Sequence, residues 1–202
     1  MDEMKMEGKI GGWIRQGFDL FKENAVTLIV ATLLVMVISG ATGGILAGPM
    51  FAGLILITLA LLDKREPKPD IGVVFKGFDY FLNTFLFWLV WGILIFAIVF
   101  LLGFFICVGN LLAAVMVLVI KTLLMFALFL IVDRKMDFWP ASLASINRVK
   151  ENFFPLLLFV LVMAAIVMAG FLACGLGVIV TLPIAVCCLA VAYRDVCGPA
   201  PA

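Results

Sequence analysis

Lys121 is the residue whose type and position most strongly suggest chemistry. It lies in a long uncharged stretch, eleven residues after Asn110 and twelve before Asp133. At about 1.5 Å of rise per residue, a helix would hold its ammonium group roughly 16–18 Å from either end of that stretch. Such a charge inside a membrane is costly unless it meets a carbonyl group, a water-filled cavity or an anion. Lys121 is therefore the candidate intramembrane functional residue.

Three interpretations of Lys121 are open, because no acidic residue lies at the same depth along the chain. In the first, the lysine is structural, either neutral or bound to helix carbonyl groups and to hydroxyl groups such as those of Thr122 and Thr181. In the second, it contacts the anion of a ligand, substrate or partner. In the third, the span is displaced in register and the lysine lies nearer the surface. Only the second interpretation implies a function.

Three aspartates, Asp63, Asp133 and Asp195, follow the three apolar blocks of the chain. A carboxylate at the C-terminal end of a helix opposes the helix dipole and costs roughly 0.3–1 kcal/mol when it is exposed. Because this unfavourable placement occurs three times, we expect each aspartate to have a partner elsewhere in the fold. The expected partners are the adjacent basic residues or three lysines, Lys22, Lys76 and Lys150. The interpretation is a ring of salt bridges at the cytoplasmic end, and a gate or proton relay is the alternative.

Catalytic chemistry has little support in this composition. The chain has no histidine, and its five cysteines include no CxxC pair. The commonest general base and the commonest zinc ligand spacing are therefore missing. Phosphate-binding glycine loops, nucleophile elbows and nucleic-acid motifs are also absent from the sequence. We expect no enzymatic activity, no cofactor, no metal and no nucleic-acid partner. Cys107 and Cys174 would fall at outer turns, where either a disulfide or simple packing between helices is open.

The elements that must position these residues are membrane helices. Hydrophobic residues make up 66% of the chain and charged residues only 13%. Three apolar blocks, at about 25–62, 84–132 and 153–193, are each too long for one crossing of about 20 residues and are each interrupted by glycine. We therefore predict an all-α polytopic protein with one transmembrane domain, 1–202, in which six transmembrane helices form three helical hairpins.

The distribution of charge predicts the orientation of these hairpins. The chain has 14 Lys and Arg and 13 Asp and Glu residues, and all but Lys121 lie in the N-terminal tail, two loops or the C-terminal end. Lys and Arg are retained on the cytoplasmic side of a membrane. Both termini are therefore expected to be cytoplasmic. The N-terminal segment lacks the features of a signal peptide, so the first span is expected to remain as an anchor.

Each hairpin is preceded by an amphipathic segment, at about 10–24, 70–83 and 137–152, expected to lie in the headgroup layer as an interfacial helix. The alternative is that these segments are cytoplasmic extensions of the spans that follow. Asp70 and Asp137 are placed to cap the second and third helices. The motif GFDLF of the first segment recurs as GFDYF in the second, and KEN precedes both the first and the third hairpin. These recurrences indicate a parallel three-fold repeat.

Three glycines spaced four residues apart, Gly40, Gly44 and Gly48, lie where the first hairpin is interrupted. If this stretch is helical, they form a smooth strip that allows a second helix to approach closely. Close helix packing is therefore the predicted role of the three glycines. A slot for a ligand is the weaker alternative.

Residues 9–95 contain GW, GFDLFKEN, a span, a Gly-rich turn, GPMFAGL, a second span, LLDKREP and DIGVVFKGFDYF. This arrangement resembles a broad group of uncharacterised bacterial multi-pass integral membrane proteins. It is also similar to the membrane domain fused to some glycerophosphodiester phosphodiesterases. The resemblance implies a protein of the bacterial inner (plasma) membrane. It does not imply phosphodiesterase activity, because the catalytic domain is not in this chain.

The expected function is that of a non-enzymatic scaffold or accessory subunit that packs with membrane lipids, with other membrane-protein subunits or with copies of itself. The alternative is a small transporter or lipid-handling protein with a central cavity and Lys121 as its anion contact. Negligible outer loops favour the first expectation, and the repeat favours the second.

Overall fold

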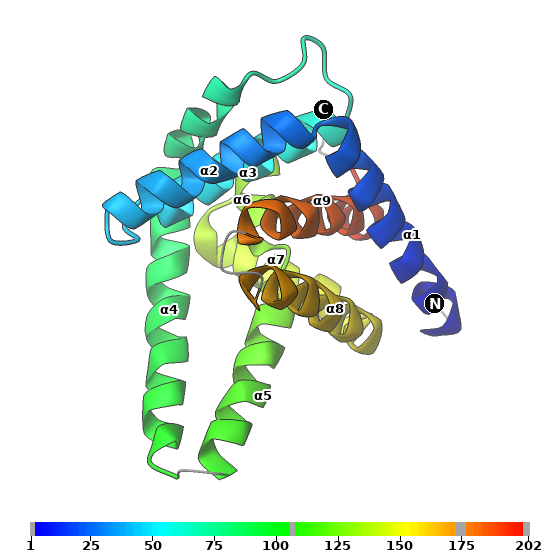
Figure 1. The fold of residues 1–202 in the computed structure, drawn as a ribbon. Coiled ribbons are helices and arrows are strands. Elements are labelled where there is room, and N and C mark those ends of the chain that lie inside the picture. The colour runs from blue at the N-terminus through cyan, green and yellow to red at the C-terminus, as the bar shows by residue number, and fades with distance from the viewer. Residues whose placement is uncertain (1–2, 106–107, 173–176, 200–202) are drawn as a thin grey trace.

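The computed structural model describes residues 3–105, 108–172 and 177–199, with side chains from residue 9 onward, and within these ranges the chain is helical with no strand. In chain order the elements are α1 (Glu3–Glu23), α2 (Ala25–Ala41), α3 (Ala47–Leu62), the 3-10 helix η1 (Ile71–Tyr80), α4 (Phe81–Gly103), α5 (Val108–Leu123), α6 (Ala127–Asp133), α7 (Phe138–Lys150), α8 (Phe153–Leu172) and α9 (Val178–Cys197). Figure 1 shows their arrangement.

Length and composition qualify four helical stretches of the described chain to cross a membrane: Ile71–Gly103, Val108–Asp133, Phe153–Leu172 and Val178–Cys197. A fifth crossing results if α1 and α2, which meet at an angle of 91°, are taken as one bent span. Helix α3 is apolar but has only 16 residues, or about 24 Å, against a hydrocarbon core of about 30 Å. The described chain is therefore all-α, with four or five helices long and apolar enough to cross a membrane, which is compatible with a multi-pass membrane protein.

The core is built mainly from α3, α6 and α9. Almost every residue of α3 from Gly48 to Leu59, and of α9 from Pro183 to Ala192, is buried. Helix α6 contributes Phe129, and its neighbour Phe126 is also buried. Both rings pack against the ring of Tyr193, with centroids 5.2 Å and 6.0 Å away. The three helices that end at the charged side of the chain are thus also its most buried helices.

The amphipathic elements cover this core in a regular order: α1 packs against α9, η1 against α3, and α7 against α6. Glycines permit the closest approaches. A Cβ built at Gly17 would lie 2.6 Å from the backbone of Cys188. A Cβ at Gly53 would overlap the carbonyl group of Val74, and one at Gly77 would overlap the backbone of α3. The first two amphipathic elements therefore touch their helices through the main chain, which only glycine allows.

Ser145 of α7 explains why α5 and α6 are separate helices. Its hydroxyl group donates to the carbonyl oxygen of Leu123 at 2.7 Å, and the backbone N–H of Phe126 donates to the same hydroxyl group at 3.3 Å. These two backbone groups lie at the end of α5 and at the start of α6. A hydroxyl group inserted in this way interrupts the helical hydrogen-bond ladder and satisfies both freed groups. The sequence pattern did not predict this break, which lies two residues after Lys121.

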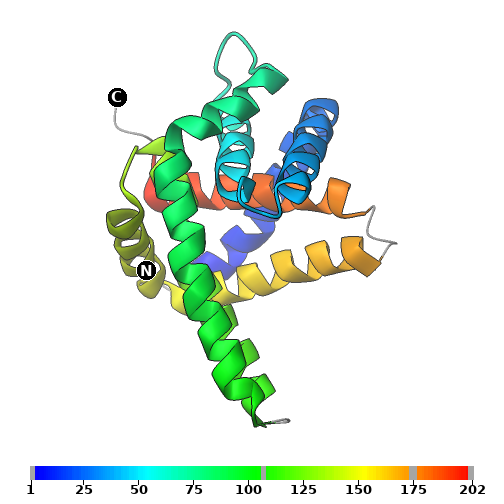
Figure 2. The ribbon, with the colours of Figure 1, turned by 90° about the vertical axis from the view of Figure 1, so that its left-hand side faces the viewer.

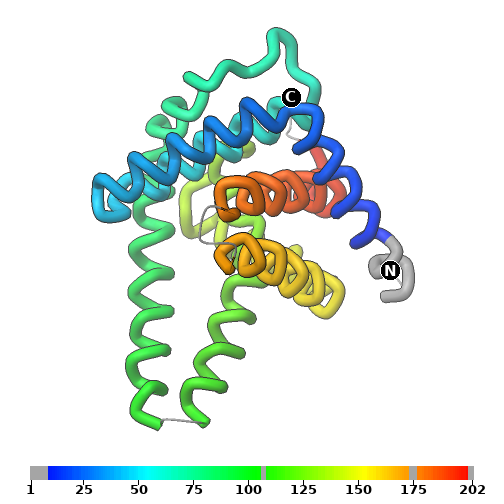
Figure 3. The backbone as a smooth tube through the Cα atoms, in the orientation of Figure 1, coloured from blue at the N-terminus to red at the C-terminus, as the bar shows by residue number. Residues whose placement is uncertain are grey.

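Helices α4 and α5 extend side by side away from the rest of the fold (Figures 1 and 2). The tube in Figure 3 shows that α2, α8 and α9 run at a large angle to them. Of the apolar window within Ile71–Gly103, only 6% is buried. The exposed rings of Phe96 and Phe100 stack on α4 with centroids 6.0 Å apart, and Phe104, just after α4, packs edge-to-face on Phe100 at 5.5 Å. This hairpin exposes apolar side chains along its length.

The three glycines expected to form one helical strip do not do so. Helix α2 ends at Ala41 and α3 begins at Ala47, and between them Gly44 adopts a φ of +88°. A left-handed glycine ends a helix, because its neighbours cannot continue the hydrogen-bond ladder. Gly40 and Gly44 are exposed, and only Gly48 is buried, where a Cβ would lie 3.0 Å from the carbonyl oxygen of Thr84. The close-packing prediction is therefore wrong for Gly40 and Gly44.

The two expected helix caps differ in outcome. Asp70 caps η1, and its carboxylate accepts a hydrogen bond from the N–H of Gly72 at 3.4 Å, as predicted. Asp137 occupies the N-cap position of α7 without making a side-chain capping bond. Its carboxylate instead accepts a bond from the amide group of Asn83 at 3.3 Å, and the Asn83 carbonyl group accepts from the N–H of Phe138. Asn83 thereby connects the start of α4 to the start of α7.

Candidate functional site

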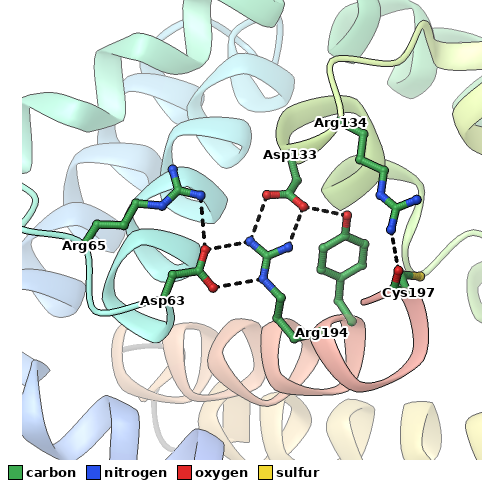
Figure 4. Close-up of polar contacts among 7 residues, drawn as sticks. Asp63, Arg65, Asp133, Arg134, Arg194 and Cys197 are labelled. Atoms are coloured by element: carbon green, nitrogen blue, oxygen red, sulfur yellow. Dashed lines mark hydrogen bonds and ion pairs between the residues drawn. The ribbon is translucent and has the colours of Figure 1, made fainter. Parts of the chain in front are cut away.

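The most strongly bonded polar site centres on Arg194, near the end of α9. Its Nε donates to Asp63 Oδ1 at 3.0 Å and its Nη2 to Asp63 Oδ2 at 2.8 Å. Its Nη1 donates to Asp133 Oδ2 at 2.5 Å and its Nη2 to Asp133 Oδ1 at 2.9 Å. Arg194 therefore makes two bidentate pairs, and Figure 4 shows the guanidinium group between the two carboxylates. We call Asp63, Asp133 and Arg194 the aspartate–arginine cluster.

The cluster is largely shielded from water. The side chain of Asp133 is 2% exposed, that of Arg194 14% and that of Asp63 27%. Asp133 also accepts a hydrogen bond from the hydroxyl group of Tyr193 at 2.9 Å. A buried carboxylate is costly unless its lone pairs are used, and here the arginine and the tyrosine use them. The cluster joins the ends of α3, α6 and α9.

Two further arginines surround the cluster (Figure 4). Arg65 donates to Asp63 at 3.1 Å, but its side chain is 56% exposed. Arg134 donates to the carbonyl oxygen of Cys197, one of the last groups of α9. The Nε of Arg134 is buried and has no hydrogen-bond partner among the described residues. The cationic surroundings offset the two carboxylates, so the site is close to neutral overall.

Asp195 lies outside the cluster, although we expected it to be the third member of the ring. Its carboxylate accepts hydrogen bonds from Lys9 at 3.0 Å and from the indole N–H of Trp13 at 3.2 Å, both on α1. The third position of the ring belongs instead to Arg194. The sequence carried a signal for this, because the last apolar residue is followed by aspartate in Leu62-Asp63 and Val132-Asp133 but by arginine in Tyr193-Arg194.

The three lysines proposed as ring partners lie elsewhere. Within the described ranges, none of Lys22, Lys76 and Lys150 takes part in an ion pair. All three side chains are on exposed faces of the amphipathic elements, whereas the side chain of Asp133 is only 2% exposed. The ammonium group of Lys22 lies over the ring of Phe18, 4.6 Å from its centroid. The cation that bridges Asp63 and Asp133 is therefore Arg194 of another helix, and the three lysines face outward.

Lys121 lies in the last turn of α5, and its side chain is exposed. It forms no ion pair with any residue in the described part of the chain. The hydroxyl group of Thr122, one of its expected partners, donates instead to the carbonyl oxygen of Leu118 at 2.8 Å. The hydroxyl group of Thr181 is buried and has no partner among the described residues. Lys121 is thus set apart from the aspartate–arginine cluster.

Two hollows flank α1 at the charged end of the molecule. The first, of about 540 Å³, is lined by Lys9, Trp13 and Asp195 together with the outer side of Asp63 and Arg194. The second, of about 550 Å³, lies between α1 and the loop that follows α3. Lys121 lines neither of them. Neither hollow could therefore provide the anion site expected beside Lys121.

Metal and thiol chemistry have no assembled site in the described residues, where no group of three or more Cys, Asp or Glu side chains could hold a metal ion. Cys187, Cys188 and Cys197 are free and buried. Cys107 and Cys174, the possible disulfide pair, lie outside the described residues.

The aspartate–arginine cluster can fix helix ends in place, because its donors and acceptors are matched and largely buried. Comparison of the chain with protein-family models, with curated proteins and with solved structures gives no match in any of the three.

Proposed function

We propose that this chain is a non-enzymatic integral membrane protein that acts as a scaffold or accessory subunit. The observation that carries the proposal is the exposed apolar surface of α4 and α5. Residues such as Trp88, Ile93 and Phe100 are exposed along it with no charged side chain between them. A surface of this kind is stable only against lipid or against another apolar protein surface.

The proposed location is the bacterial inner membrane, with both termini on the cytoplasmic side. The aspartate–arginine cluster, the loop after α3 and the end of α9 carry the ionisable groups of one end. The sequence at the tip of the α4–α5 hairpin, around Phe104 and Phe105, contains no charged residue. This asymmetry supports placing the charged end in the cytoplasm.

Six crossings arranged as three repeated hairpins remain our proposal for the topology. The regular order of packing supports it, because each amphipathic element covers the core helix that ends the preceding hairpin, and α1 covers the last one, α9. The two glycines of the repeated GFD motif, Gly17 and Gly77, each make a close backbone approach to a core helix, Gly17 to α9 and Gly77 to α3.

Photo-crosslinking from two adjacent positions of α4 tests the scaffold proposal. Trp88 is 50% exposed, whereas its neighbour Phe87 is 8% exposed and serves as the matched control. A benzophenone amino acid is introduced at each position and irradiated in native membranes. At Trp88 we expect a discrete adduct with a second polypeptide, either another copy or a different subunit. At Phe87 we expect reaction only within the chain. Adducts with lipid alone at both positions would contradict the scaffold proposal.

A small transporter or lipid-handling protein is the second candidate, because Lys121 is exposed and forms no ion pair with a described residue. A cation in this state within an apolar hairpin is able to receive an anion. Phosphate uptake into proteoliposomes tests this for the simplest anion. We expect Lys121→Met to abolish this phosphate flux. The same change should leave unchanged the photo-crosslinked adduct formed from position 88. Full phosphate flux in this variant would exclude Lys121 as the anion contact.

A further inference from the structure

The second hollow beside α1 has walls of opposite charge. Asp19 and Glu23 line it from α1. Lys64, Arg65 and Lys68 line it from the loop after α3, together with one acidic residue, Glu66, so that this wall is basic in excess. Its floor is apolar and includes Leu61 of α3. The hollow has a volume of about 550 Å³, which is within the usual range for a small-molecule site.

The opposite charges in this hollow do not neutralise one another by direct contact. No ion pair joins Asp19 or Glu23 to any cation among the described residues. Arg65, the third cation that lines the hollow, is directed to Asp63 of the aspartate–arginine cluster. The acidic wall and the basic wall are therefore held apart, and each retains bonding capacity.

Lys64 occupies a backbone position at which lysine is unfavourable. Its φ is +51°, in the left-handed region. Its N–H donates to the carbonyl oxygen of Leu61 at 3.2 Å, and the N–H of Arg65 donates to that of Ala60 at 3.0 Å. These two bonds define a Schellman motif, and glycine is the usual residue at its left-handed position. The backbone alone would favour glycine here, so replacement of Lys64 by glycine removes the side chain and keeps the backbone conformation.

We propose that this hollow binds a phosphate ester that carries a primary amine, the chemistry of a phosphoethanolamine headgroup. The phosphate group lies against Lys64 and Lys68, and the ammonium group lies against Asp19 and Glu23. A purely anionic headgroup would be repelled by the α1 wall, and a simple amine would be repelled by the loop wall. The inference rests on the proposed membrane location, because the apolar floor at Leu61 receives the start of the acyl chains.

The test uses the purified full chain and measures bound lipid by native mass spectrometry. The probes are phosphatidylethanolamine, phosphatidylglycerol, which lacks the amine, and free phosphoethanolamine. Lys64→Gly removes the basic contact while the backbone conformation is retained, and Glu23→Gln removes part of the acidic contact. Lys135→Gly is the matched control, because Lys135 also has a left-handed backbone, with a φ of +52°, but does not line the hollow.

We expect phosphatidylethanolamine to bind more tightly than phosphatidylglycerol. Lys64→Gly and Glu23→Gln should each weaken that binding by about fivefold, the upper effect of one partly exposed charge contact. Lys135→Gly should leave it unchanged. Tighter binding of the lipid than of free phosphoethanolamine identifies a membrane source, and equal binding identifies a soluble one.

Equal binding of the two lipids, or equal effects of Lys64→Gly and Lys135→Gly, would overturn the proposed site. Either result leaves the membrane location intact, since that is measured separately by whether the chain resists alkaline extraction from membranes. Release of the chain by alkali would instead contradict the proposed function itself.

Discussion

Replacement of Arg194 by methionine is expected to cause a large loss of stability, because it leaves a buried carboxylate without its cation. Methionine retains most of the aliphatic volume of arginine but cannot donate a hydrogen bond. Asp133, with a side chain only 2% exposed, would lose two bonds of 2.5 Å and 2.9 Å and keep only the bond from Tyr193. Asp63 is less affected, since its side chain is 27% exposed and retains Arg65.

The magnitude follows from this difference in burial. Removing one partner of a fully buried ion pair costs about 3–5 kcal/mol. The remaining Tyr193 bond and the partial hydration of Asp63 lower the expected loss for Arg194→Met to about 2–4 kcal/mol. Arg65→Met is the matched control, because that arginine has a side chain 56% exposed and makes one bond of 3.1 Å to Asp63. An exposed pair of this kind contributes less than about 1 kcal/mol.

The assay is the apparent free energy of unfolding of the purified protein, from titration with sodium dodecyl sulfate followed by far-ultraviolet circular dichroism. The double variant Arg194→Met/Asp133→Asn should recover part of the loss, because asparagine removes the uncompensated charge and still accepts the Tyr193 bond. If Arg194→Met and Arg65→Met lower the free energy of unfolding equally, the cluster does not secure the helix ends and the reasoning fails.

Three further outcomes are expected. Gly53→Ala should lower the free energy of unfolding by about 2–3 kcal/mol, because the new Cβ overlaps the carbonyl group of Val74. Gly92→Ala is the control and should cause no loss, because no atom lies within 4 Å of a Cβ at that position. Equal losses in the two variants would contradict the close contact of η1 with α3. Ser145→Ala should cost about 1–3 kcal/mol in the same titration by leaving two backbone groups unsatisfied, and a loss below about 0.5 kcal/mol would argue against its role in the break. Lys68→Cys, in a variant without the five native cysteines, should react with an impermeant thiol reagent in inverted vesicles but not in intact cells. Labelling in intact cells would contradict the proposed orientation.

The sequence predicted the helical class and the apolar blocks because both depend on composition and on the spacing of charges. It also predicted the interruption near Gly44 and the cap made by Asp70, since turn and cap residues act within a few positions of themselves. It could not predict the break after α5, which is caused by Ser145, a residue more than twenty positions away. The apolar block at 25–62 does not divide into two helices of spanning length, because α3 is apolar but short.

The candidate site was located in the correct stretches of sequence but with an incorrect composition. Asp63 and Asp133 were singled out because a carboxylate at a helix end is unfavourable without a partner, and both have one. The same argument applies by residue type to Asp195, but the side chain of this helix end that faces the core is Arg194. Equivalence within a repeat is a property of position, and residue type is free to change.

Exchanging the charges of the cluster tests this positional equivalence. If residues 63, 133 and 194 are equivalent, the double variant Asp63→Arg/Arg194→Asp keeps one arginine between two aspartates. It should recover at least about 1.5 kcal/mol of the stability lost in the two single variants, because this is a typical coupling energy for contacting residues. The transposition Arg194→Asp/Asp195→Arg has the same composition but moves the arginine to the outer position beside Lys9. It should recover nothing, since it leaves three carboxylates in the cluster and two cations together outside it. Equal recovery by both exchanges would mean that net charge alone matters at this end of the chain and that the cluster has no defined third position.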